Sequence, residues 1–113
     1  MTGPMEAMVL AWSEREFQQH VVETAKALQW MAFHQFDSRR SEPGWPDLVL
    51  IHRGKGLLMF RELKTERGRT TAKQDECLAG LESVGQDAGV WRPRDWVSRR
   101  IHAELAGKRV EDA

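Results

Sequence analysis

Apolar residues recur every three or four positions along residues 13–29, which is the spacing of one face of an amphipathic helix. The stripe consists of Phe17, Val21, Ala25 and Leu28. Ser13 and Glu16 have the spacing of a capping box, in which each side chain bonds the backbone N–H of the other residue. We therefore predict that a helix begins at Ser13 and ends at about Gln29.

Three short apolar segments with strand-like composition follow this helix. They are "WMAFHQF" (30–36), "LVLI" (48–51) and "LLMFRELK" (57–64). The polar stretch 37–44 contains proline and glycine, which predicts a loop, and "HRGKG" predicts a turn. The second and third segments are thus expected to pair as a hairpin.

The remainder of the chain alternates between helix and strand. Thr70 or Thr71 can cap a second helix, and residues 88–92 have the composition of a last strand. Asp95 can cap a final helix that ends at about Ala106. The resulting order, αβββαβα, predicts an α/β fold with a central mixed sheet flanked by helices.

Length and composition favour one globular domain. The chain has 113 residues, of which 41% are hydrophobic and 30% charged, and we expect a core over about residues 13–106, with a short N-terminal extension and a frayed C-terminal tail. No apolar run approaches the roughly 20 residues of a membrane span, and the N-terminus does not resemble a signal peptide. Cys77 is the only cysteine, which excludes an internal disulfide and favours a reduced, cytoplasmic setting.

The formal net charge is zero, but the charges are unevenly distributed. Residues 1–37 contain two basic side chains and five acidic ones, whereas residues 39–73 contain nine basic and four acidic ones. Such a segment can form a basic face on a protein that is neutral on average. A polyanionic partner such as nucleic acid therefore remains compatible with the composition.

Charged residues interrupt the most apolar strands of the predicted hairpin. Strand alternation places Glu62 and Lys64 on one face, roughly 7 Å apart, and a hairpin around "HRGKG" brings Asp47 near Glu62. Two carboxylates that converge at strand ends suit a hard divalent cation such as Mg²⁺. A neighbouring lysine can hold or deprotonate an attacking water and offset charge on a phosphoryl oxygen.

An ordinary structural explanation exists for each of these residues. Asp47 is compatible with a turn, and Glu62 and Lys64 with a solvated strand pair, which is the commoner origin of an isolated "ExK". Their position across two adjacent apolar strands instead favours a metal site. Gly44 would let the backbone or a substrate come close to this site.

The motif "PD…ELK" resembles the PD-(D/E)xK nuclease superfamily. Four longer segments resemble the virus-type replication-repair nuclease (VRR-NUC) family, in its small stand-alone form found in phages and prophages. They are "SEREFQQHVVETAKALQW", "FHQFDSRRSEPGWPDLVL", "RELKTERGRTTAKQ" and "VWRPRDW". The resemblance covers about residues 13–100. It implies a restriction-endonuclease-like αβββαβ core and a Mg²⁺-dependent endodeoxyribonuclease, with Mn²⁺ as a substitute, in the cytoplasm of a bacterial or phage-infected cell.

The resemblance also implies a further acid on the first helix and a glutamine on the helix after the lysine. Glu14 fits the position of this acid in "SExxFQ", while Glu16 is better explained as the capping-box residue; either acid also complements the helix dipole. Gln74 matches the glutamine, although an exposed helix terminus explains it nearly as well. Gln18 lies one turn beyond Glu14 on the same face, where it can orient a ligand or a phosphate.

The resemblance therefore gives every candidate a role. The predicted metal ligands are Asp47, Glu62 and Glu14, and Lys64 and Gln74 complete the predicted catalytic set. Basic residues near the site would contact the DNA backbone, because arginine's planar fork matches phosphate geometry. The predicted DNA-binding residues are Arg39, Arg40, Arg67, Arg69, Lys73 and Gln18. Trp45 either packs against the fold or offers a surface on which a base can stack.

Several functions are compatible with this set. The leading hypothesis is an endonuclease that cuts branched DNA, and the alternatives are a flap-type or general DNA nuclease and a non-catalytic DNA-binding subunit with the same fold. The complete trio of Asp47, Glu62 and Lys64 favours catalysis. A restriction-type enzyme is disfavoured because the chain leaves little room for an element that reads bases.

The expected assembly is a homodimer without a membrane partner. The resemblance implies that stand-alone members pair and resolve Holliday junctions, and two-fold symmetry would place two identical sites on symmetry-related strands. Two sets of apolar residues are candidates for the interface. They are Trp91, Trp96, Val97 and Ile101, or Val9, Leu10 and Trp12.

Overall fold

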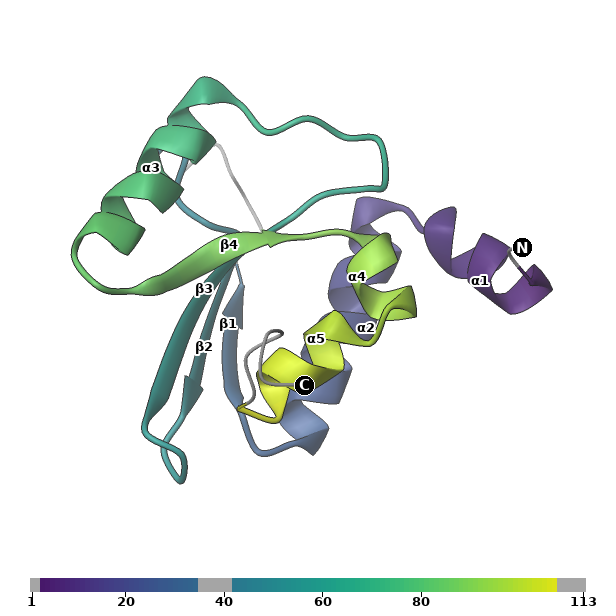
Figure 1. Cartoon of the computed structure of the whole chain (residues 1–113), viewed down its shortest axis with the longest axis horizontal. Coiled ribbons are helices and arrows are strands. Elements are labelled where there is room, and N and C mark those ends of the chain that lie inside the picture. The colour runs from purple at the N-terminus through teal and green to yellow at the C-terminus, as the bar shows by residue number, and fades with distance from the viewer. Residues whose placement is uncertain (1–2, 35–41, 108–113) are drawn as a thin grey trace.

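The computed structural model describes residues 3–34 and 42–107, which form five helices and four strands (Figure 1). The helices are α1 (Pro4–Leu10), α2 (Glu14–Ala27), α3 (Ala72–Ser83), α4 (Pro93–Val97) and α5 (Arg100–Leu105). The strands are β1 (Met31–His34), β2 (Leu48–His52), β3 (Leu57–Leu63) and β4 (Asp87–Trp91). The predicted α/β class is confirmed.

The four strands form one mixed sheet in the order β1-β2-β3-β4. The first two pairings are antiparallel, and β3 pairs with β4 in parallel, so the chain crosses over through α3 between them. In the β2–β3 hairpin Leu48 lies opposite Arg61 and Leu50 opposite Met59. This register fixes which residues meet at the end of the hairpin that is far from its turn.

The hydrophobic core lies between the sheet and α2. The helix contributes Phe17, Val21 and Ala25, which are fully buried. Leu48 and Leu50 face them from β2. Leu28, the fourth residue of the predicted apolar stripe, is instead exposed because the helix ends before it. Figure 1 shows α2, α4 and α5 on one side of the sheet and α3 on the other. Glu62 lies on the face under α3, where Gln74 of that helix binds it.

Helix termini follow the local sequence closely. Ser13 and Glu16 form the predicted capping box, so α2 begins as expected, but it ends at Ala27 with Leu28 as its C-cap, two residues earlier than predicted. Gln29 then has a positive φ of 74°, which is incompatible with continuing the helix. Of the two proposed caps for α3, Thr71 is the one used.

The C-terminal helix differs from the prediction. It is divided into α4 and α5 because Arg99, between them, adopts a left-handed conformation. Asp95 is not the N-cap: Pro93 takes the first position of α4, where its missing N–H costs nothing, and Arg92 is the cap. The Asp95 carboxylate instead accepts a hydrogen bond from the Arg92 N–H at 2.8 Å from the third helical position.

Some of the apolar residues proposed for an interface are used inside the fold. Trp91 and Ile101 are fully buried and Val9 is nearly so, and Trp96 packs edge-on against Trp12 with ring centroids 5.4 Å apart. Trp91 and Ile101 are therefore not available for an interface, whereas Trp96, Val97, Leu10 and Trp12 are only partly buried. Helix α1, which the hydrophobic pattern did not predict, packs on α4.

No helix in the described part of the chain has the length and hydropathy needed to cross a membrane.

Candidate active site

Asp47 lies immediately before β2, at the open end of the β2–β3 hairpin. Because Leu48 pairs with Arg61, Asp47 is placed beside Glu62, as the sequence predicted. Its Oδ2 atom accepts a hydrogen bond from the backbone N–H of Leu63 at 3.0 Å. This bond fixes the carboxylate against the edge of β3.

Glu62 is a charged residue in the interior of a strand. Its side chain is 1% exposed, and its Oε1 atom accepts a hydrogen bond from the Gln74 side-chain amide at 3.1 Å. Its Oε2 atom is buried and has no hydrogen-bond partner. A buried carboxylate oxygen without a donor is costly to stability, and a bound cation would supply the missing partner.

The pKa of Glu62 is raised to about 9, first by burial and then by Asp47. Two carboxyl groups can hydrogen-bond only through a shared proton, so the contact with Asp47 stabilises the protonated form. The charge of Lys64 opposes this shift, and the charge of Glu14 adds to it. Without a bound cation the chain therefore favours a neutral, protonated Glu62, because Lys64 does not offset burial and the neighbouring carboxylates.

Glu14 is the helix acid that faces this cluster. Its pKa is raised by burial and by the charge of Asp47, while Lys64 lowers it, which shows that all three groups lie within electrostatic reach. Glu16, the alternative, is engaged at the helix start, where its Oε1 accepts from the Ser13 N–H at 3.1 Å. The geometry thus favours Glu14 as the acid at the site.

Lys64 directly follows β3 and is half-buried. Its backbone N–H donates to the carbonyl of Trp91 at 3.1 Å, which extends the β3–β4 pairing by one residue. The backbone is thereby held where the ammonium acts on both Glu14 and Glu62.

Gln74 has two functions in this arrangement. It forms a capping box with Thr71, since its Oε1 accepts from the Thr71 N–H at 2.9 Å, and its amide nitrogen donates to Glu62. The interpretation of Gln74 as merely an exposed residue at a helix terminus therefore leaves out its contact with Glu62. Gln18 is bonded elsewhere: its amide nitrogen lies 2.8 Å from Nδ1 of His34.

Gly44 brings the loop before Asp47 into contact with α3. It has a φ of +91°, and a Cβ built on it would lie 2.4 Å from the carbonyl oxygen of Lys73. Both facts exclude a larger residue without displacing the first turn of α3. The close approach predicted for this glycine is thus an approach of the chain to itself. This contact fixes the position of the loop that carries Asp47 against the first turn of α3, which carries Gln74.

Two arginines of "RPRD" hold the segment that follows Lys64. The Arg92 guanidinium donates to the carbonyls of Thr65 at 2.7 Å and Gly68 at 2.6 Å. Arg94 binds Glu66 through its backbone N–H at 3.0 Å and through Nε at 2.9 Å. Sequence reasoning assigned these arginines no role, although the cluster of basic residues around a helix-starting proline was visible.

The predicted DNA-binding residues are only partly described by the structure. Arg67, Arg69 and Lys73 are exposed, in the segment after Lys64 and the first turn of α3. Arg39 and Arg40 lie outside the described residues. Trp45 is half-exposed and contacts Phe60 edge-on, with ring centroids 5.7 Å apart, so it both packs and presents a surface.

The carboxylates of the site are candidate ligands for a divalent cation. Within residues 3–34 and 42–107, no three His, Cys, Asp or Glu side chains are gathered as a ready-made metal cage. Mg²⁺ requires only one or two protein carboxylates, because it keeps several waters and binds substrate phosphates. Asp47 and Glu62 supply two converging carboxylates, and Oε2 of Glu62 lacks a partner. The residues present therefore fit Mg²⁺ or Mn²⁺.

Comparisons with known proteins bear on the family and the fold. A family model described as the VRR-NUC domain matches residues 3–95. A solved structure of a VRR_NUC domain is similar to this chain with a TM-score of 0.65 and 24% identity, covering 79% of this chain and 94% of that one. At that identity the likeness shows a common fold. No curated protein matches the chain.

Proposed function

The chain belongs to the VRR-NUC family of nucleases, and from this premise we propose that it is a metal-dependent endonuclease that cuts branched DNA. The observation that carries the proposal is the convergence of Asp47 and Glu62 around a buried, unpartnered carboxylate oxygen. Glu14 and Lys64 lie within electrostatic reach of the same point. Family membership implies DNA binding; the metal, the branched substrate and the assembly are our proposals.

Each residue has a distinct part in the proposed reaction. Asp47 and Glu62 would hold Mg²⁺, with Glu14 assisting, and the ion when bound supplies charge stabilisation at the phosphoryl group and a more acidic water. Lys64 donates a hydrogen bond to the attacking water or to a phosphoryl oxygen and offsets charge there. The side-chain amide of Gln74 binds Oε1 of Glu62, which leaves Oε2 of Glu62 for the ion.

Backbone contacts are proposed to dominate DNA affinity. Arg67, Arg69 and Lys73 are exposed next to the site, and Arg39 and Arg40 are basic residues of the preceding loop sequence. Phosphate contacts release counterions without reading bases. Five such contacts would give a log–log salt slope of roughly −4 to −5 and little dependence on sequence.

A homodimer that resolves four-way junctions is the proposed assembly and substrate. One site with a small basic face offers little means to select a branched structure, whereas two sites related by two-fold symmetry match the symmetry of a junction. A monomeric flap-type or general nuclease is the alternative. The two differ in oligomeric state and in whether nicks occur in pairs.

The test is a nicking assay in Mg²⁺, Mn²⁺ and EDTA on duplex, flap and four-way junction DNA, with light scattering at micromolar concentration. We expect a dimer that makes paired nicks in the junction only when metal is present. Asp47→Asn should abolish cleavage, and Glu82→Gln, an exposed acid on α3, should not. A strict monomer that cuts flaps and spares junctions would remove the junction proposal, and cleavage undiminished in EDTA would remove the metal.

A further inference from the structure

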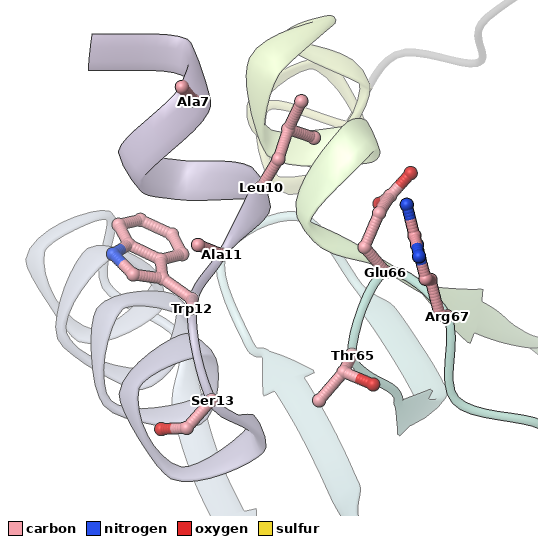
Figure 2. A pocket seen from close by; sticks show the side chains of 8 residues that line it. All are labelled: Ala7, Leu10, Ala11, Trp12, Ser13, Thr65, Glu66 and Arg67. Carbon is pink, nitrogen blue, oxygen red and sulfur yellow. The ribbon is translucent and has the colours of Figure 1, made fainter. Parts of the chain in front are cut away.

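A shallow pocket of about 640 Å³ lies between α1 and the segment that follows Lys64 (Figure 2). Figure 2 shows Leu10 and Ala11 on one side and Thr65, Glu66 and Arg67 on the other. Trp12 forms part of the lining below α1. None of the three carboxylates of the site lines this pocket.

Both walls of the pocket continue directly from residues of the site. Ser13, which lines it, precedes Glu14, and Thr65, which also lines it, follows Lys64. Consecutive Cα atoms are about 3.8 Å apart, so each wall begins one residue from a side chain of the proposed active site. A DNA strand with one phosphate at the carboxylates has its neighbouring nucleotide within reach of this pocket.

The lining suits a nucleotide. Leu10 and Trp12 are partly exposed, and although the Trp12 ring stacks on His20 with centroids 4.1 Å apart, its remaining surface lines the pocket beside Leu10. Arg67 offers a cation to a phosphate. Ser13 and Thr65 accept hydrogen bonds from Glu16 and Gly68 through their hydroxyl oxygens, and each hydroxyl retains a proton to donate. A volume of this size is in the range of small-molecule sites.

The acid in the wall is neutralised by the fold. Glu66 is bound by Arg94 through the backbone N–H and the guanidinium, and a further guanidinium hydrogen bond of 3.2 Å reaches its carbonyl. Arg92 fixes the carbonyls on either side, those of Thr65 and Gly68. The wall is therefore preorganised, and its carboxylate does not repel a phosphate as a free one would.

We propose that this pocket receives the nucleotide next to the scissile phosphate, with its base unstacked against Leu10 and the exposed part of Trp12 and its phosphate toward Arg67. The proposal rests on the nuclease function and extends it to substrate choice. Removing a base from a duplex stack costs free energy, and the cost is least where the base is already unpaired. The pocket thus gives a physical reason for preferring branched DNA over continuous duplex.

A bulky side chain placed in the pocket tests whether a nucleotide binds there. Ala7 and Met8 are adjacent and exposed on α1, but only Ala7 lines the pocket, so Ala7→Trp and Met8→Trp form a matched pair. Affinity for a four-way junction is measured by fluorescence anisotropy in Ca²⁺ without Mg²⁺. Ala7→Trp should weaken binding about tenfold, the scale of one lost base stack, and Met8→Trp should not. Ala11→Trp is a second way to fill the pocket if Ala7→Trp does not fold.

An abasic scan identifies the nucleotide. Single abasic sites are placed at each position around the cut, and one position should weaken binding to the wild type about tenfold but leave Ala7→Trp unaffected. Equal binding by the two tryptophan variants, or additive losses at every position, would overturn the pocket proposal. Cleavage in Mg²⁺ is scored separately: a wild type that binds with this pattern but never cuts refutes the nuclease function and leaves the pocket standing.

Discussion

Arg61 and Glu62 are consecutive residues of β3, both are charged, and both are buried, with exposed fractions of 3% and 1%. Strand alternation sends their side chains to opposite faces of the sheet. On one face the charge is matched by the chain, and on the other it is not. The difference separates a charge that serves the fold from one that serves the chemistry.

Arg61 is surrounded by acceptors. Its guanidinium binds Asp87 at 2.8 Å and Glu104 at 2.9 Å, donates to the carbonyl of Phe60 at 2.9 Å, and lies over the Trp91 ring at 5.0 Å from the centroid. Only its Nε lacks a hydrogen-bond partner. This is the arrangement that makes a buried charge tolerable: paired, hydrogen-bonded and packed.

Glu62 has the opposite surroundings. It receives one amide hydrogen bond, faces the carboxylate of Asp47, and keeps one oxygen without a partner. A fold optimised for stability alone would not retain such a group, whereas pKa values perturbed in this way cluster at functional sites. The contrast teaches that burial of a charge says little until its partners are counted.

The largest expected effect is the loss of cleavage in Glu62→Gln. Removing one metal-binding carboxylate should lower kcat/KM at least about 1,000-fold, roughly 4 kcal/mol of transition-state stabilisation. The free energy of unfolding should not fall, because the neutral amide that replaces the carboxyl can face Asp47 without having to bind a proton. Cleavage kinetics, Mn²⁺ calorimetry and urea unfolding check this. Undiminished Mn²⁺ binding would show that Glu62 is not a ligand.

Arg61→Met should show the reverse pattern. It leaves the buried carboxylate of Glu104 with less compensation, and we expect unfolding free energy to fall by about 3 kcal/mol. Cleavage per folded molecule should stay near that of the wild type. Arg94→Met, which breaks an exposed pair with Glu66, is the control, with an expected loss under about 1 kcal/mol. Equal losses in the two variants would contradict the assignment of Arg61 to the fold.

The two faces should also respond to pH with opposite signs when metal is removed by EDTA. Glu62 has a folded pKa of about 9 against an ordinary value of 4.5, so the folded state holds a proton that the unfolded chain releases between these values. Its stabilising contribution is full below about pH 4.5 and is lost as pH rises toward 9. Glu62→Gln should therefore gain stability relative to the wild type from pH 5 to pH 8.5.

Glu104 provides the other sign. Burial raises the pKa of Glu104. The charge of Arg61 and the hydrogen bonds from Arg100, Arg61 and Trp91 together lower it by more, so the net pKa is lowered. Its contribution is present above its ordinary value and is lost as pH falls through the lowered pKa. Glu104→Gln should be less stable than the wild type at pH 7, with the difference shrinking in acid. Parallel pH profiles for the two glutamine variants would refute the comparison.

The smallest effect is expected for Gln74→Ala. This removes the amide bound to Glu62 and half of the capping box of α3, so unfolding free energy should fall by about 1 kcal/mol and cleavage several-fold. Gln74→Glu keeps the cap but adds a carboxylate beside Glu62. Cleavage should fall more in that variant than in Gln74→Ala. If Gln74→Glu cleaved like the wild type, Gln74 would act only as a cap.

Much of the fold could be predicted because local chemistry determines it. The capping boxes at Ser13 and Thr71 set where two helices begin, and short apolar segments predicted the hairpin that joins Asp47 to Glu62. The convergence of these two residues depends on one turn and one register, both of which are visible in a short window of sequence.

The rest depends on contacts between distant segments, which no local pattern encodes. Arg61 meets Glu104 across 43 residues, and Arg94 meets Glu66 across 28. In the sequence Arg61 was one more cation of a basic stretch, and the structure shows it to be consumed by the fold. Trp91 and Ile101 were similarly assigned to an interface because their burial depends on where α5 docks.

The sheet contains two kinds of strand pairing, which differ in the length of chain between the paired strands. β2 and β3 meet across a tight turn, whereas β4 reaches β3 only after α3 has crossed over. Pairings between distant segments carry the larger loop-closure entropy and tend to form later during folding. Gln74 lies on that crossover, and Arg92 follows β4. Consequently, we expect a local opening of α3 and β4 to dismantle the surroundings of Glu62 and Lys64 while the antiparallel strands stay paired, so amide exchange should distinguish loss of the site from loss of the fold.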